Sequence, residues 1–110
     1  MGDLACVRAL PDQDGTRIIA CSGEFDIDSQ DALSQALHAA CHAGVTRTVL
    51  DLGRVSFVDS SVLNTLLMAH HRQHLVLAGP LAPHIARLFS VTGTDTVLNI
   101  APDLASACAE

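Results

Sequence analysis

The chain has 110 residues with a hydrophobic fraction of 49%, a length typical of one domain and a composition that excludes intrinsic disorder. Its net charge is −6, and its six basic residues are separate Arg residues, so it lacks the basic patch that binds nucleic acid or an anionic membrane surface. Its longest stretch without charged residues, 32–46, is too short to span a membrane. We therefore expect a soluble cytoplasmic protein, a single domain over residues 1–110.

The four Cys residues are far apart and include no Cys-x-x-Cys pair. This spacing is not that of a disulfide-rich secreted scaffold or of a zinc site. Charged residues from Asp3 onward also argue against a signal peptide. We expect reduced, mostly buried thiols.

The chain opens with a predicted hairpin. Residues 4–10 form a short apolar run, and an Asp-Gly turn separates them from a second run at 16–22, rich in β-branched residues. This arrangement predicts two antiparallel strands. An acidic loop is expected next, at residues 23–28.

The first predicted helix follows this acidic loop. Apolar residues recur at helical spacing from Leu33 to Gly44, and the Gly is expected to end the helix. Asp28 or Ser29 is the expected N-cap, and Asp31 in the first turn suits the helix dipole.

The second half of the chain alternates strands and helices. The expected elements are strands at 46–52, 74–78 and 96–100, helices at 60–71 and from Pro83 to about residue 92, and a terminal helical turn at 103–109. The resulting order, ββαβαβαβ, predicts an α/β fold with one mixed β-sheet, an opening antiparallel hairpin and helices packed on the sheet. The loops after the second and third strands are expected to lie side by side at one edge of the sheet.

The most informative segment is Asp59-Ser60-Ser61, at the expected start of the second long helix. A Ser oxygen there can simply cap the helix by accepting one of its free amides. The same amides also favour a phosphate, which would add roughly −1.5 to −2 charges beside Asp26, Asp28 and Asp59. Capping and phosphate acceptance both remain open on spacing alone.

The motif Asp-Leu-x-x-Val-x-Phe-x-Asp-Ser-Ser-x-Leu at 51–63 resembles the STAS domain of bacterial anti-sigma factor antagonists. Gly-Glu-Phe-Asp at 23–26 and Leu-Phe-Ser-Val-Thr-Gly at 88–93 resemble two further elements of that family. The resemblance covers essentially the whole chain. It implies a STAS fold and a non-enzymatic protein that acts by phosphorylation-controlled partner switching in transcription regulation.

By this resemblance, Ser60 is the phosphorylated residue, and Asp26, Asp59 and Ser61 match family positions beside it. The partner is an anti-sigma factor that is also a Ser kinase; the unphosphorylated form binds it and releases a sigma factor, and a Ser phosphatase reverses the modification. On the same helix, Asn64 and Met68 are expected to extend the partner-binding surface. Many family members have Gly where this chain has Val62, whose bulk is expected to lie beside the acceptor.

Two other functions remain open. One is a STAS subunit of a membrane transporter, such as a lipid-exporting ABC system, in which the same helix start docks on the ATPase subunit. The other is a Ser hydrolase, although the segment lacks the Gly-x-Ser-x-Gly elbow.

Further polar residues in the sequence have ordinary structural explanations. His70, His71 and His74 cluster without a carboxylate to complete a metal site, so we expect no metal and no cofactor. Asp51 is expected to accept a hydrogen bond from a nearby amide.

Overall fold

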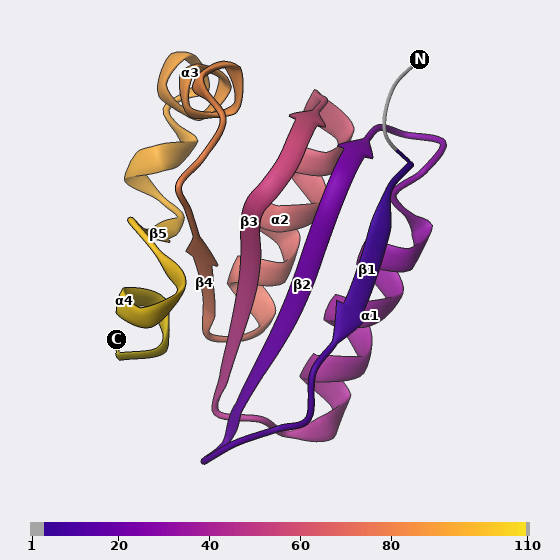
Figure 1. Cartoon of the computed structure of the whole chain (residues 1–110), viewed down its shortest axis with the longest axis vertical. Helices are drawn as coiled ribbons and strands as arrows, with labels where there is room; N and C mark the ends of the chain where they lie inside the picture. Colours follow the sequence, from indigo (N-terminus) through magenta and orange to yellow (C-terminus); the bar gives the residue numbers. More distant parts are fainter. Residues whose placement is uncertain (1–3, 110) are drawn as a thin grey trace.

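A computed structural model describes residues 4–109 of the chain (Figure 1). The strands are β1 (Cys6–Ala9), β2 (Thr16–Phe25), β3 (Arg47–Val58), β4 (Leu75–Ala78) and β5 (Asn99–Ala101). The helices are α1 (Asp31–Ala43), α2 (Ser60–Arg72), α3 (Pro83–Thr92) and α4 (Leu104–Ala109), with a short 3₁₀ helix, η1 (Thr94–Thr96). No helix in residues 4–109 is long and apolar enough to cross a membrane.

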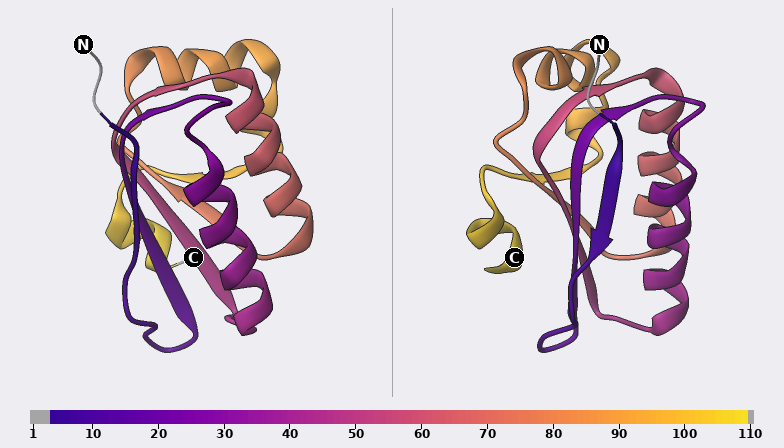
Figure 2. Two further views of the ribbon diagram at one scale, coloured as in Figure 1. Left: turned by 90° about the vertical axis from the view of Figure 1, so that its right-hand side faces the viewer. Right: turned by 45° about the vertical axis from the view of Figure 1, so that its right-hand side comes forward.

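The strands form one mixed sheet in the order β1-β2-β3-β4-β5, in which β1 runs antiparallel to β2 and the other neighbouring pairs are parallel. Helices α1 and α2 lie side by side on one face of the sheet, and α4 lies on the other face (Figure 2). The larger core lies under α1, α2 and α3 and includes Phe25, Leu50, Leu66 and Phe89. The predicted α/β architecture with an opening antiparallel hairpin is confirmed.

The long central pair of strands, β2 and β3, extends further than the sequence predicted. We expected a loop from residue 23 and a strand end at residue 52, but β2 continues to Phe25 and β3 to Val58, where these two residues pair. The pairing passes two register shifts, and Gly23 has φ 90°, a backbone conformation that favours Gly. The acidic loop is consequently shorter and begins at Asp26.

The ends of helix α1 illustrate a correct and an incorrect prediction. Gly44 ends the helix in the left-handed conformation, with φ 73°, as predicted. The expected N-cap was wrong, because α1 begins at Asp31 after Gln30, which makes no side-chain capping bond. The Ser29 hydroxyl is used elsewhere: it hydrogen bonds the carbonyl of Glu24 (3.3 Å) and the carboxylate of Asp26 (2.9 Å).

The four Cys residues are free thiols in this structure, and only one of them is fully buried. Cys21 is buried in β2, Cys41 and Cys108 are half-buried, and Cys6 is exposed. Burial raises the pKa of the Cys21 thiol to about 12, with smaller contributions from Asp51 and Cys6. The expectation of mostly buried thiols was therefore wrong: only Cys21 is buried, and the exposed Cys6 lies on β1, an edge strand of the sheet.

Candidate functional site

The loop after β2 and the junction between β3 and α2 meet at one edge of the sheet. The amide of Ile27 donates to Oδ2 of Asp59 (3.0 Å), and the Gln30 side chain donates from Nε2 to the Oγ of Ser61 (3.2 Å). Both contacts join residues about thirty positions apart in the chain. The predicted neighbourhood of the two loops is confirmed.

Asp59, rather than a Ser, caps helix α2. Its Oδ1 accepts from the amide of Val62 (3.1 Å) and from the hydroxyl of Ser61 (2.6 Å). Partial burial tends to raise the pKa of Asp59, but these hydrogen bonds and the one from the Ile27 amide outweigh it, so the pKa lies below the ordinary 3.8. Asp59 is therefore a carboxylate with both oxygens engaged, and the expectation that a Ser oxygen provides the cap was wrong.

The two adjacent hydroxyls at the start of α2 have different surroundings. Ser61 is half-buried, and its hydroxyl bonds Asp59 and Gln30. Ser60 is exposed, and its hydroxyl makes no hydrogen bond to any other residue in 4–109. A free hydroxyl on the surface is accessible to another protein, whereas the Ser61 hydroxyl is held in the junction.

The acidic loop beside this junction is held by its own carboxylate. Oδ1 of Asp26 accepts from the amides of Asp28 (2.9 Å) and Ser29 (3.0 Å), an Asx-type turn. Asp28 is exposed. The Ile27 amide ties this loop to Asp59. The three acids predicted to lie beside the acceptor hydroxyl therefore come from two neighbouring segments: Asp26 and Asp28 from the loop, and Asp59 from the start of α2.

A face of α2 continues from the junction. Asn64 and Met68 follow Ser60 at four-residue intervals and are therefore on the same side of the helix. Both are exposed, and Asn64 Nδ2 lies 3.8 Å from the Met68 sulfur. The structure thus brings these predicted residues together with Ser60 on one solvent-accessible helix face.

Val62 does not crowd this face. Its side chain is only 1% exposed and belongs to the core. The expectation that its bulk would lie beside the acceptor hydroxyl was wrong, since the core stripe of α2 consists of Val62, Leu63, Leu66 and Ala69.

Three residues of the junction were missed by the sequence analysis. Ile27 is 66% exposed and Phe57 is 41% exposed; Phe57 stacks on His84 with ring centroids 5.9 Å apart. Gln30, directly before α1, links the start of α1 to α2, because its Oε1 accepts from the Thr65 hydroxyl at 2.6 Å. The position of Ile27 as a single apolar residue between two acids could have indicated its exposure. Nothing in the sequence indicated the long-range hydrogen bond of Gln30.

Other candidate residues lie outside the junction. Asp51 accepts from the Gly53 amide (3.0 Å), as predicted. In the part of the chain that the structure describes, no group of three or more His, Cys, Asp or Glu side chains is placed to hold a metal. None of the hydrogen bonds within residues 4–109 joins a His to Ser60 or Ser61, so the described geometry contains no Ser-His pair of the kind a hydrolase uses.

Comparisons with known proteins agree with this architecture. A curated relative from Bordetella bronchiseptica, described as "Putative anti-sigma factor antagonist BtrV", is 27% identical over 100 residues, which cover 87% of this chain and 86% of the relative. The crystal structure of an anti-sigma factor antagonist from Mycobacterium paratuberculosis has a TM-score of 0.83 at 27% identity and covers 94% of this chain and 92% of that one.

The unphosphorylated form of the anti-sigma factor antagonist SpoIIAA has a TM-score of 0.72 at 19% identity, over 88% of this chain and 89% of that one, a likeness of fold. The family model described as "Mlab, STAS domain" matches residues 8–101, which include the end of β1, the β3–α2 junction and the whole of β5. The chain therefore belongs to the STAS domain family.

Proposed function

We propose that this protein is an anti-sigma factor antagonist that is switched by phosphorylation of Ser60. In its unphosphorylated form it binds an anti-sigma factor that is also a Ser kinase, and the sigma factor is released. A Ser phosphatase restores the binding form. The chain acts by binding, in the cytoplasm, and carries out no catalysis of its own.

The observation that carries this proposal is the exposed, unbonded hydroxyl of Ser60 at the start of α2. Its neighbours Asp59 and Ser61 are occupied by structural hydrogen bonds. The similarity to anti-sigma factor antagonists supports the identity of the partner. Exposed apolar side chains near the junction, Ile27 and Phe57, would supply the desolvated contacts that a protein interface needs.

Phosphorylation would act through charge. A phosphate adds roughly −1.5 to −2 charges directly after the Asp59 carboxylate and close to the acidic loop tied to it. An acidic surface on the partner would then face a like charge, and this repulsion would weaken binding by several kcal/mol. Since each 1.4 kcal/mol or so is a tenfold change in affinity, one phosphate is enough to separate the complex.

The acceptor assignment is tested by incubating the protein with the cognate kinase and ATP and measuring its intact mass. Wild type is expected to gain one phosphate, and Ser60→Ala none. Ser61→Ala is the matched control, because it removes the adjacent hydroxyl and should still be phosphorylated. Phosphorylation of Ser60→Ala to the wild-type extent would refute the assignment.

The charge mechanism is tested by calorimetry with the purified anti-sigma factor. Ser60→Asp is expected to weaken binding by about tenfold or more, whereas Ser60→Asn, which has nearly the same shape without the charge, is expected to bind much as wild type does. Equal affinities of the two variants would contradict a mechanism based on charge.

A second function is supported by the description of the matching family model, "Mlab, STAS domain". Here the chain is a STAS subunit of a membrane transporter, and the same junction binds the ATPase subunit without phosphorylation. The neighbouring genes supply the discriminating reagents: either a small kinase-like anti-sigma factor or an ATPase that accompanies a permease. Titrating the protein with each purified candidate distinguishes the two functions, because only one of them is expected to bind.

A further inference from the structure

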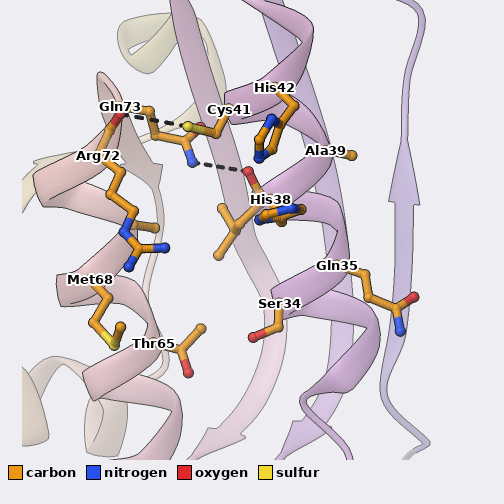
Figure 3. A pocket seen from close by; sticks show the side chains of 12 residues that line it. Ser34, Gln35, His38, Ala39, Cys41, His42, Thr65, Met68, Arg72 and Gln73 are labelled. Carbon is orange, nitrogen blue, oxygen red and sulfur yellow. Dashed lines mark hydrogen bonds between the residues drawn. The ribbon is translucent and has the colours of Figure 1, made fainter.

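A groove of about 510 Å³ lies between α1 and α2, on the outer side of the helical layer (Figure 3). It is lined by residues from the stretch 34–42 of α1 and from the stretch 65–73, which comprises the second half of α2 and its C-cap Gln73. Its volume falls within the range of about 300–1,000 Å³ that is typical of small-molecule sites. It is separate from Ser60, which begins α2 and is not among its lining residues.

The groove combines an apolar wall with basic groups. Leu37, Met68 and Ala69 supply hydrocarbon surface, while Arg72, His38 and His42 supply the basic groups. Figure 3 shows the Arg72 side chain reaching from α2 into the space between the helices, with the two His side chains on the α1 side.

The electrostatics of the groove differ from those of the whole chain. The protein carries a net charge of −6, yet no Asp or Glu lines the groove. Within residues 4–109 the Arg72 guanidinium takes part in no salt bridge and no side-chain hydrogen bond. A cation without a carboxylate partner beside an apolar surface is complementary to a ligand with one negative group.

The inner end of the groove is held by hydrogen bonds. Gln73 donates from Nε2 to the carbonyl of Leu37 (3.0 Å) and accepts from the buried Thr48 hydroxyl (2.6 Å). The Cys41 thiol lies 3.7 Å from the carbonyl of Arg72. These contacts join the two helices and the sheet, so the groove is formed before any ligand binds.

The dimensions of the groove favour a small molecule over a helix of a partner protein. Each wall spans eight residue steps, which is roughly 12 Å at 1.5 Å per residue. An average helix of about 10–14 residues would extend past both ends. A chain of seven or eight carbons with a terminal anionic group matches the length and the polarity.

We propose that the groove between α1 and α2 binds a small amphiphilic anion, with its hydrocarbon part against Leu37, Met68 and Ala69 and its anionic group on Arg72. This site is distinct from the proposed phosphorylation site and does not depend on it, although Met68 belongs both to the groove and to the helix face that carries Ser60. His38 and His42 complete the basic end of the groove.

The proposal is tested by titrating the ¹⁵N-labelled full chain with octanoate and following the amide shifts by NMR. Saturable binding is expected with a dissociation constant of about 1 mM or lower, as suits a ligand of about ten non-hydrogen atoms. The shift changes should be centred on the lining stretches 34–42 and 65–73. Octylammonium and octanamide, which have the same hydrocarbon chain, should bind at least about tenfold more weakly.

Matched variants identify the group that recognises the anion. Arg72→Gln is expected to weaken octanoate binding about tenfold or more, and Arg72→Lys should restore part of the affinity. Arg87→Gln removes an exposed Arg outside the groove and should bind as wild type does. The proposal is overturned if octanoate does not bind saturably, if octylammonium binds equally well, or if Arg72→Gln retains wild-type affinity.

Discussion

Removing the Asp59 side chain tests whether this carboxylate holds the β3–α2 junction together. It accepts from the Val62 amide at the start of α2 and from the Ile27 amide of the neighbouring loop. Loss of a helix N-cap costs about 1 kcal/mol, and loss of the second, partly solvated bond to an ionised acceptor adds about 1 kcal/mol. We expect Asp59→Ala to lower the free energy of unfolding by about 2 kcal/mol.

Urea unfolding followed by circular dichroism measures this loss, which corresponds to a fall in Tm of about 8 °C for a domain of this size. Asp28→Ala is the matched control, because Asp28 is an exposed acid of the same region whose carboxylate accepts no hydrogen bond within residues 4–109. It should change stability by less than about 0.5 kcal/mol. Equal losses in the two variants would refute the assignment of Asp59 as the residue that ties the two segments.

The same carboxylate predicts a pH dependence of known sign. Because the native pKa of Asp59 lies below 3.8, its contribution to stability is fully present above the unfolded-state pKa, about pH 4, and is lost as the pH falls through the lowered native value. The stability difference between wild type and Asp59→Asn should therefore shrink in acid. A difference that stays constant from neutral pH down to about pH 2 would contradict this.

Two further predictions concern the thiols and a strand Gly. Exposed Cys6 should react rapidly with an alkylating reagent at neutral pH, whereas Cys21, whose pKa burial raises to about 12, should react only after unfolding; peptide mass spectrometry identifies the labelled residue. Gly23→Ala should lower the free energy of unfolding by about 3 kcal/mol or more. The added Cβ would collide with the backbone carbonyl of Leu4, and the φ of 90° at this position is strained for any residue with a side chain. Gly44→Ala is its control: φ is also positive but the space is open, so urea titration should show a loss of only about 1 kcal/mol.

The sequence predicted the order of elements because each long element carries its own periodicity. The sequence did not predict the ends of β2 and β3, where the two strands stabilise each other by pairing. The end of β3 buries Leu52, Val55 and Val58 at intervals of three residues, a spacing that matches no simple strand pattern. Pairing with β2, through two register shifts, keeps that segment extended, and such pairing is not visible in either strand alone.

The sequence predicted where the candidate site lies, but not which of its side chains make the hydrogen bonds. Asp and Ser are both favoured N-caps, so Asp59-Ser60-Ser61 gives three possible helix starts, and only the contact from the Ile27 amide shows why the first is used. The inward orientation of the Val62 side chain could have been predicted from the sequence, since Val62 and Leu66 lie four residues apart on the helix face that packs on the sheet. The bridge from Gln30 to Ser61 and Thr65 joins separate helices and has no local signature.

The separation of Ser60 from the hydrogen bonds of Asp59 has a genetic consequence. Asp59 and Ser61 take part in the hydrogen bonds of the junction, whereas the accessible hydroxyl belongs to Ser60. Substitutions at Ser60 should leave protein abundance in the cell unchanged, whereas substitutions at Asp59 should lower it. Alleles of Ser60 are therefore suited to separate loss of the proposed phosphorylation switch from loss of protein.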